Sequence, residues 1–545
     1  MANIVIDPVT RIEGHMRLET EVTNGKVSNA WSTGTLYRGV EAILQNRDPL
    51  DAWMITQRIC GICTYVQGIA SIQSVENSLN LTVPENARII RNLLMGSQYI
   101  HDHIVHFYTL HMLDWVDITK AILADPAKTV TVDRQISSTR TRNTAYFTAV
   151  KQKLATFVSS GQLGPFANGY WGHSGYLLSA EQSLVFMADY LEALNFQGKV
   201  AKIHAILGGK NPHPQGMLIG GVSLKLDFTA TRLNEVAALL TAAKDFVNTY
   251  YLPDVTAIST VYKGYASVGD TANLLCFGEF PLSSSGSGSL FFPRGAIFNQ
   301  ATTSVQPVDV ANITEHVARS WYDGSDALNP TVGEVVPAYS GLNLSAKYSW
   351  LKAPRYQGQP MEVGPLARVM VGYGKNATAI VAAVKTFLSQ TGLTLPQMYS
   401  TIGRTAARAI ETKVIADALP GWNSSLLARL NFGDLTNRKS FTMLTGGNGV
   451  ALSEAPRGAL GHWVTYSGGK ITNYQMVVPS TWNFGPRDAN GVAGPVEQAL
   501  VDTPVVDRTK PLEVLRTVHS FDPCLACAVH LYDPAGGDAV DITVR

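Results

Sequence analysis

The chain has 545 residues, of which 46% are hydrophobic and 16% are charged, and this composition excludes intrinsic disorder as a description of the whole. Its 43 basic and 42 acidic residues leave a formal net charge of +1, so no overall field favours nucleic acid as a partner. At roughly 150 residues per domain, the length allows three or four domains or one composite enzyme body. The small charged share also suggests that another subunit covers part of the surface.

Antiparallel strands are predicted near the N-terminus. MRLETEV and KVSNAW alternate polar and apolar residues on either side of Asn24-Gly25, the strongest short signal for a hairpin. The first residues, MANIVIDPVTRIEGH, have no basic run and carry Asp7 and Glu13, so they do not form a signal peptide. We therefore expect a β-rich segment over about residues 1–50.

A long, largely buried helix is predicted next. Thr82 and Glu85 form the pattern of a capping box around Pro84, and apolar residues then recur at helical spacing as far as Tyr108. Glycine-rich segments elsewhere, PLSSSGSGSL and TGGNG, are predicted to be flexible loops. Neither leads from a strand into a helix with the glycine and lysine spacing of a phosphate-binding loop.

A second long helix is predicted after Ser179 and Gln182, which repeat the capping pattern, and Gly208-Gly209 ends it. No run of about 18 uninterrupted apolar residues occurs, since candidates such as AIVAAVKTFL carry a charge, and we expect no membrane span. The expected fold is therefore α+β and predominantly helical. Long buried helices would form a central bundle with smaller peripheral antiparallel β elements. Further helices are predicted in NEVAALLTAAKDFVNTYY, NATAIVAAVKTFL and RTAARAIETKVIADAL.

Four of the five cysteines form two CxxC pairs at opposite ends of the chain, Cys60 with Cys63 and Cys524 with Cys527. Two such pairs can supply four thiolates to a soft metal ion, although one pair alone could be a redox dithiol. A closed structural zinc site is the alternative, but zinc ribbons usually place their pairs roughly 15 to 20 residues apart. Cys527 is not followed directly by His, which excludes a c-type haem. The fifth, Cys276, is expected to be a small buried hydrophobe.

Seven motifs occur in the order found in the large, catalytic subunit of nickel-iron hydrogenases, and the chain resembles that family from end to end, in its uptake type associated with a membrane-bound respiratory complex. The resemblance implies the fold of that subunit and a nickel ion bound by Cys60, Cys63, Cys524 and Cys527. Cys63 and Cys527 would also bridge to an iron that carries carbon monoxide and cyanide. The implied reaction is the reversible splitting of dihydrogen into protons and electrons. The motifs are DPVTRIEGH, RICGICTYVQ, HDHIVHFY, GGKNPHPQ, EAPRG, VVPSTWN and FDPCLACAVH.

Heterolysis of dihydrogen needs a soft Lewis acid and a nearby base, because dihydrogen is a very weak acid. The thiolate of Cys524 could ligate nickel and accept the proton. By resemblance, Glu13 is the glutamate that relays the proton outward. Taken alone, Glu13 would be interpreted as a solvated carboxylate near a strand.

Further site residues follow from the resemblance. Arg457 matches an arginine whose fixed charge lies over the open metal position, and Asp102 and Asp522 match the acidic residues that pair with it, which would offset the cost of burying a charge. Pro479 and Ser480 match positions that line the cyanide ligands, with the hydroxyl as donor. Without the resemblance, Arg457 would be a surface arginine and Ser480 a turn residue.

A magnesium site is also implied, with Glu41, the backbone carbonyl of Met476 and the ring of His530 as ligands. Each side chain has an ordinary alternative, since Glu41 could be a helix-terminus carboxylate and His530 a surface histidine. The histidines of the HDHIVHFYTLH segment are expected to pack within a helix and not to form another metal site. His213 is expected to lie toward the electron-accepting partner.

One residue departs from the family. Gln67 stands where the family usually has histidine, four positions after the second cysteine of the first pair, and an amide cannot titrate. The change removes no ligand, but hydrogen-sensing members also carry glutamine here. We therefore keep three hypotheses: a hydrogenase, a slow hydrogen sensor, and a structural zinc protein with four cysteines.

Partners also follow from the resemblance. With only Cys276 left, this chain cannot hold iron-sulfur clusters, so an iron-sulfur small subunit would form an obligate heterodimer with it, and a dimer of heterodimers is allowed. Residues 1–530 would be the mature catalytic subunit, with a helical body over about 51–530. A maturation protease would remove residues 531–545 after nickel-insertion factors had acted. Export with the small subunit would place the pair on the periplasmic side of the cytoplasmic membrane, where it would reduce a membrane electron acceptor.

Overall fold

The computed structural model describes residues 2–161, 166, 169–224, 228–284 and 288–528. Its first element is an antiparallel sheet in the order β1-β2-β3. Asn24 and Gly25 form the β2–β3 turn with φ angles of 51° and 73°, which suit these two residue types. The predicted hairpin is confirmed. The strands are β1 (Ala2–Ile6), β2 (Met16–Thr23) and β3 (Lys26–Gly34).

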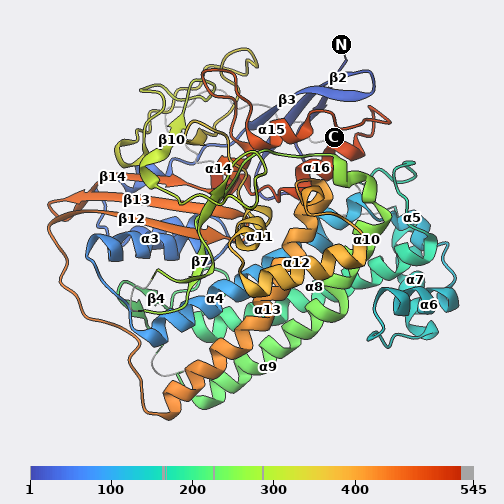
Figure 1. The fold of residues 1–545 in the computed structure, drawn as a ribbon, viewed down its shortest axis with the longest axis horizontal. Coiled ribbons are helices and arrows are strands. Elements are labelled where there is room, and N and C mark those ends of the chain that lie inside the picture. The colour runs from blue at the N-terminus through green and yellow to red at the C-terminus, as the bar shows by residue number, and fades with distance from the viewer. Residues whose placement is uncertain (1, 162–165, 167–168, 225–227, 285–287, 529–545) are drawn as a thin grey trace.

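Long helices make up much of the rest of the molecule. The helix α4 contacts α8 and α13, and α9 contacts the same two helices. Figure 1 shows the four side by side in the lower half of the view, with α12 beside α13. They are α4 (Glu85–Ile104), α8 (Ala180–Gly208), α9 (Ala230–Phe246) and α13 (Thr401–Asn431), joined by α10 (Leu252–Val261), α11 (Pro365–Gly374) and α12 (Thr378–Thr391).

The two predicted capping boxes have different outcomes. At α8 the Ser179 hydroxyl accepts the Gln182 N–H and the Gln182 side chain accepts the Ser179 N–H, so this prediction is confirmed. At α4 the prediction is wrong, because the N-cap is Pro84 and no side chain caps the helix. The Glu85 carboxylate instead accepts hydrogen bonds from Arg88, and is therefore not available to reach back to the helix start.

A second antiparallel sheet, β12-β13-β14, lies within the region predicted as a helical body. Its strands are β12 (Gly446–Ala455), β13 (Gly458–Ser467) and β14 (Lys470–Val477). The loop prediction for TGGNG is wrong, since these residues run into β12. The helix α3 (Val66–Ser78) packs closely on this strand, and a Cβ on Gly449 would lie 1.8 Å from the Ser74 carbonyl oxygen. This close approach requires glycine at position 449. The glycines make the sequence of the strand resemble that of a loop.

The remaining elements of the described part of the chain are short strand pairs and helices of up to 16 residues. Four two-stranded pairs are β4 (Met217–Leu218) with β5 (Gly221–Val222), β6 (Leu274–Cys276) with β9 (Gly295–Ile297), β7 (Glu279–Pro281) with β8 (Leu290–Phe292), and β10 (Ile313–His316) with β11 (Ala353–Tyr356). The peripheral helices are α5 (Ile118–Ala121), α6 (Pro126–Ile136) and α7 (Thr144–Ser159). Those near the chain ends are α1 (Val40–Leu44), α2 (Ala52–Thr56), α14 (Pro479–Phe484), α15 (Pro495–Leu500), α16 (Leu512–Ser520) and α17 (Leu525–Ala528).

The main hydrophobic core runs through the helices and the first sheet and includes Cys60, Cys63 and Cys524. Cys276 is also fully buried, as predicted, and its thiol donates to the Pro293 carbonyl. Among the described residues, no helix has the length and apolar character needed to cross a bilayer.

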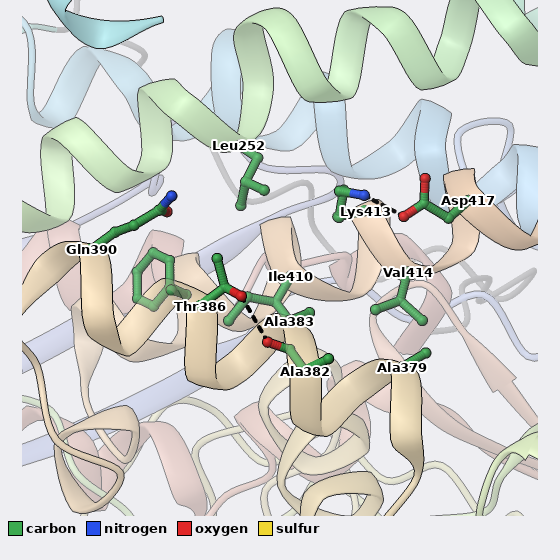
Figure 2. A pocket seen from close by; sticks show the side chains of 11 residues that line it. Leu252, Ala379, Ala382, Ala383, Thr386, Gln390, Ile410, Lys413, Val414 and Asp417 are labelled. Atoms are coloured by element: carbon green, nitrogen blue, oxygen red, sulfur yellow. Dashed lines mark hydrogen bonds and ion pairs between the residues drawn. The ribbon is translucent and has the colours of Figure 1, made fainter.

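A groove of about 330 Å³ lies between α12 and α13 beside the start of α10 (Figure 2). Alanine and aliphatic side chains line most of it, together with the ion pair between Lys413 and Asp417. None of the predicted site residues lines this groove. Concave apolar pockets are the usual place for a drug-sized ligand, but the residues with predicted chemistry lie elsewhere, in the core.

Candidate metal centre

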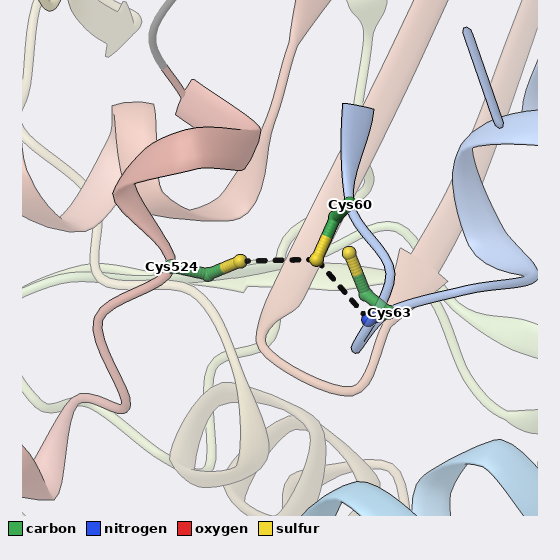
Figure 3. Close-up of side chains that lie close together, drawn as sticks. All are labelled: Cys60, Cys63 and Cys524. Atoms are coloured by element: carbon green, nitrogen blue, oxygen red, sulfur yellow. Dashed lines mark hydrogen bonds between the residues drawn. The ribbon is translucent and has the colours of Figure 1, made fainter. Parts of the chain in front are cut away.

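Three cysteines from opposite ends of the chain converge in the core (Figure 3). The Sγ atoms of Cys60 and Cys524 are 3.6 Å apart, and those of Cys60, Cys63 and Cys524 all lie within 4.8 Å of one another. The Cys63 N–H donates to the Cys60 sulfur at 3.2 Å, which is the compact CxxC turn ahead of α3. The prediction that both cysteine segments meet at one point is confirmed for these three thiols.

The remaining predicted ligands at the C-terminal end lie partly or wholly outside the described residues. The helix α17 begins directly after Cys524, and the backbone of Cys527 lies in it. The side chain of Cys527 lies outside the described part of the structure. His530 and the predicted tail, residues 531–545, also lie outside the described residues. Their roles stay predictions.

The N-terminal RIEG segment holds Cys524 in place through a short parallel bridge. The Glu13 N–H donates to the Pro523 carbonyl at 3.2 Å, and the Leu525 N–H donates to the Glu13 carbonyl at 2.7 Å. Gly14 follows with φ +82°, and a Cβ there would lie 2.3 Å from the Ala526 nitrogen. Only glycine permits this approach, so the motif positions the Cys524 segment as well as the glutamate.

The carboxylate of Glu13 lies directly beside the cysteine cluster. Its Oε2 accepts the Cys524 thiol at 3.2 Å and the Ala526 N–H at 3.2 Å. Burial and the nearby Cys60 raise the pKa of Glu13, while Cys524, Arg457 and the Ala526 N–H partly oppose that rise. A carboxyl group with a raised pKa, in contact with a thiol, can accept and release a proton.

Arg457 lies buried in the turn between β12 and β13. Its Nη1 donates to Asp102 Oδ2 at 3.0 Å, and its Nε lies 3.2 Å from Asp522 Oδ1. Burial alone would lower the pKa of Arg457, but the charges of Asp522, Cys524 and Asp102 outweigh it and raise the pKa well above its ordinary value. The Nη2 atom is buried and has no hydrogen-bond partner among the described residues. The site thus holds a permanent positive charge with an unused donor.

Both acidic partners of Arg457 are buried. Asp102 Oδ1 accepts a hydrogen bond from Gln98, whose amide also donates to the Ile62 carbonyl at 2.8 Å inside the first cysteine pair. Asp522 has the left-handed φ of 58°, and burial raises its pKa although Arg457 and Arg408 oppose that rise. The predicted pairing of Asp102 and Asp522 with Arg457 is confirmed.

Ser480 and Pro479 begin α14, and both are buried. The Ser480 hydroxyl accepts the Cys524 N–H at 3.0 Å, so its own proton is left to donate elsewhere. The structure therefore places Ser480 against the backbone of Cys524, one of the three clustered cysteines. Its predicted contact with an iron-bound cyanide stays a prediction.

Glu41 and Met476, two of the predicted magnesium ligands, are in contact. The Glu41 carboxylate accepts the Met476 N–H at 2.8 Å. Burial raises the pKa of Glu41 to about 7; Lys352 lowers it and Glu315 raises it. Lys352 itself pairs with Glu315 at 3.1 Å. A buried carboxylate beside a strand offers oxygen donors of the type magnesium prefers.

Gln67 lies near the start of α3 and is buried. The His462 ring donates from Nε2 to Gln67 Oε1 at 2.8 Å, and its Nδ1 lies 2.8 Å from the Tyr474 hydroxyl. The glutamine therefore joins α3 to β13 through the His462 ring, and that ring contacts Tyr474 on β14.

The histidines that follow Asp102 contact protein groups, as predicted. His103 lies 2.6 Å from Glu411, and His106 lies 2.7 Å from the His519 carbonyl. His111 and His519 both face Asp114. Besides the three cysteines, these three residues are the only group among the described residues whose ligand atoms lie close enough together to hold a metal ion. His519 Nδ1 is 2.7 Å from that carboxylate, a hydrogen-bond distance, so the cluster is interpreted as a hydrogen-bonded one.

His213 lies near the first cysteine pair, with its N–H bonded to the Thr64 hydroxyl. Burial and the charge of Arg58 lower its pKa. The predicted position toward an electron-accepting partner is untested.

Three residues that connect distant segments were missed from sequence, and Arg38 is the first. The Arg38 guanidinium donates to the carbonyls of Arg58, Ile59 and Ala526, and so joins the two cysteine segments. Its only signal was its place in YRGVE, three residues before Glu41. Gln98 and Lys352 were missed as well, because each acts through contacts between distant segments.

Comparisons with known proteins agree with this geometry. The family described as "Nickel-dependent hydrogenase" matches residues 38–530, and one described as "HoxL-like" matches residues 3–31. The chain is 44% identical to the uptake hydrogenase large subunit of Rhizobium leguminosarum bv. viciae, over 99% of this chain and 97% of that one. It is 43% identical to the hydrogenase-2 large chain of Escherichia coli (strain K12), over 99% of each. The solved Ni-Fe-Se hydrogenase from D. vulgaris Hildenborough, in the as-isolated oxidized state, has a TM-score of 0.79 and 34% identity, covering 97% of this chain and 100% of that one.

Proposed function

The chain belongs to the nickel-dependent hydrogenase family as a large subunit, an oxidoreductase acting on dihydrogen, and from this premise we propose that it cleaves dihydrogen reversibly and heterolytically. The observation that carries the proposal is the convergence of three buried thiols with Glu13 and Arg457. A hydrogen sensor is the alternative raised by Gln67, but the relatives compared here are named as uptake hydrogenase and hydrogenase chains and give it no support.

We assign the nickel to Cys60, Cys63, Cys524 and Cys527, with Cys63 and Cys527 shared with an iron that carries carbon monoxide and cyanide. The donor set fits, because three soft sulfur atoms already lie within 4.8 Å of one another in a site closed to water. When bound, the bimetallic centre supplies the soft Lewis acid that polarises dihydrogen. A magnesium ion at Glu41, the Met476 carbonyl and His530 is assigned by family analogy.

The residues of this chain provide the proton path. Cys524 Sγ accepts the proton released from dihydrogen, and Glu13 Oε2, 3.2 Å away, takes it from the sulfur. Burial raises the pKa of Glu13, and a carboxylate with a raised pKa is a stronger base, which favours uptake of the proton from the thiol.

Arg457 and the residues around it organise the open side of the centre. Asp102 and Asp522 fix the guanidinium, and its free Nη2 donor can face the substrate side. Its charge is permanent and needs no reorganisation during turnover. Ser480 and Pro479 would line the cyanide ligands, with the serine proton donated to one of them.

Electrons must leave through another chain, because Cys276 is the one cysteine not assigned to the centre. We assign this role to an iron-sulfur small subunit in an obligate heterodimer. Maturation by nickel-insertion factors and a protease that removes residues 531–545, export to the periplasmic side, and a membrane electron acceptor are part of the same proposal. They rest on family analogy.

The processed heterodimer tests the proposal directly. Elemental analysis should give about one nickel per large subunit, since four thiolates make one site, and infrared spectra should contain bands of iron-bound carbon monoxide and cyanide. Cys60→Ser should lose nickel and hydrogen-dependent dye reduction, whereas Cys276→Ser, a matched change of a buried thiol, should keep both. Zinc in place of nickel, or full nickel in Cys60→Ser, would contradict the assignment.

A further inference from the structure

We propose that Arg368 and Glu411 are positioning residues that fix the ion pair between Arg457 and Asp102. The proposal rests on the function proposed above, because it concerns how the fixed charge of that site is held. Arg368 lies on α11 and Glu411 on α13, and both are fully buried. Neither lies in the seven motifs that carry the family resemblance.

The guanidinium of Arg368 uses all five of its N–H donors. Nε and Nη2 donate to the two oxygens of Glu411 at 2.8 and 2.7 Å, a bidentate pair. Nη1 donates to Glu454 Oε2 at 2.7 Å. The other two donors reach the carbonyls of Ala455 at 2.8 Å and Pro456 at 2.6 Å. Arg368 thus leaves no donor for a ligand, and its role is to hold other groups.

The two carbonyls belong to the residues directly before Arg457 in the β12–β13 turn. This turn packs against the start of α11, since a Cβ on Gly364 would lie 2.8 Å from the Arg457 carbonyl oxygen. On the other side of the turn, a Cβ on Gly458, at φ +137°, would lie 2.6 Å from the Gly364 nitrogen. The turn is already packed tightly against the start of α11, and the hydrogen bonds of Arg368 to the Ala455 and Pro456 carbonyls hold it there.

Glu411 extends the same network to the acidic partner of Arg457. Its Oε1 lies 2.6 Å from His103 Nε2, and His103 directly follows Asp102 on α4. Burial lowers the pKa of His103 to about 4 although Glu411 raises it, so the ring is neutral at pH 7 and donates from Nε2. The Glu411 carboxylate thus contacts His103, next to Asp102, and also Arg368. Arg368 in turn holds the segment that carries Arg457.

Arg368 and Glu411 therefore set the distance between Arg457 and Asp102 through contacts with the segments that carry these two residues. The Arg457 side chain makes one hydrogen bond, to Asp102, and a 3.2 Å ion pair with Asp522, so its position depends on the segments that carry these two partners. A displacement of about 1 Å in a site can lower a rate by about 10²-fold. A lysine at position 368 would keep the charge but lose the planar five-donor fork.

The test uses Arg368→Lys and Glu411→Gln in the processed heterodimer. We expect nickel to be retained, turnover per nickel to fall by about 10- to 100-fold, and the infrared bands of the iron ligands to shift. Amide exchange in the 453–460 segment, followed by mass spectrometry, should quicken by at least about tenfold, as expected for a released turn. Should Arg368→Lys load no nickel, the nearly isosteric Glu411→Gln decides the question.

A double-mutant cycle separates positioning from general stability. In an Arg457→Lys background, Arg368→Lys should lower turnover by less than about twofold, because its target is already gone. Effects that multiply fully would overturn the proposal. Arg142→Lys, a buried arginine bonded to Asp133 and Asp189, is the matched control and should leave turnover per nickel and the infrared bands unchanged.

The two proposals fail differently. A wild-type heterodimer without nickel or hydrogen oxidation would remove the proposed function and this inference with it. A wild-type heterodimer that is active, with variants equal to it in turnover, bands and exchange, would overturn the positioning role alone.

Discussion

Two regions of this protein bury arginines among carboxylates. The guanidinium groups of the first region make more hydrogen bonds than the guanidinium group of the second. Between α6 and α8, Arg142 donates through Nε, Nη1 and Nη2 to Asp133 and Asp189, and Arg140 donates to the same two carboxylates. At the metal centre, the Arg457 side chain makes a hydrogen bond to Asp102 only, within the described part of the chain, and its Nη2 has no acceptor.

The difference separates structural from functional burial of charge. Buried polar groups are nearly always hydrogen-bonded, so a saturated cluster needs nothing further and serves to join helices. An orphaned donor beside three thiols instead marks a place for a group that the protein does not supply. The orphaned donor and the three thiols beside it, taken together, therefore point to the reactive region.

The largest expected effect comes from removing a carboxylate in each region. Glu13→Gln should lower hydrogen–deuterium exchange and turnover by about 10²- to 10⁴-fold with metal content intact, because the amide cannot carry the proton. The measurements are isotope exchange by mass spectrometry and elemental analysis. Asp189→Asn should leave turnover per nickel unchanged but destabilise the fold by about 3–5 kcal/mol, since it leaves buried arginines undercompensated.

The comparison would break if these outcomes were exchanged. Glu21→Gln is a further control for the glutamate, because this residue lies on β2 of the first sheet, apart from the cysteine cluster. Equal loss of nickel and of proton exchange in Glu13→Gln would remove Glu13 from the relay and leave it a structural role.

Replacement of an arginine by lysine in each region should have the next largest effect. Arg457→Lys should lower turnover per nickel by about 10²- to 10³-fold, because a flexible ammonium cannot replace a fixed fork directed at the open position. Steady-state dye reduction, normalised to nickel, measures it. Arg142→Lys should stay within about twofold of wild type, and a comparable loss there would show that global stability, not the orphaned donor, controls the rate.

The smallest effect is expected at Gln67. Gln67→His should change turnover by less than about tenfold while shifting the infrared bands and adding a pH dependence, because a titratable ring would replace the amide that faces His462. Gln73→His, on the same helix α3, should do neither. Slow turnover in wild type that rises strongly in Gln67→His would instead favour the sensor alternative.

The sequence predicted more of the site than of the fold around it. Asp102, Asp522 and Arg457 were predicted together only through their motifs, and the structure brings them into one ion-paired cluster. The β12–β14 sheet was missed, since Gly449 is required by packing on Ser74 and glycine is depleted in ordinary strands. Arg38 was missed because hydrogen bonds to backbone carbonyls leave no pattern in sequence.

By itself, the sequence determined the chemistry of this protein: two pairs of soft ligands, a glutamate and an arginine, each in a short motif of fixed spacing. Local spacing can specify such motifs because a CxxC turn or a strand–turn segment is made by neighbouring residues. Only the tertiary structure decided that Glu13 touches Cys524 and that Arg38, Arg368 and Glu411 hold the site. Those contacts join segments hundreds of residues apart, and their energies depend on burial and on geometry that exist only once the chain has folded.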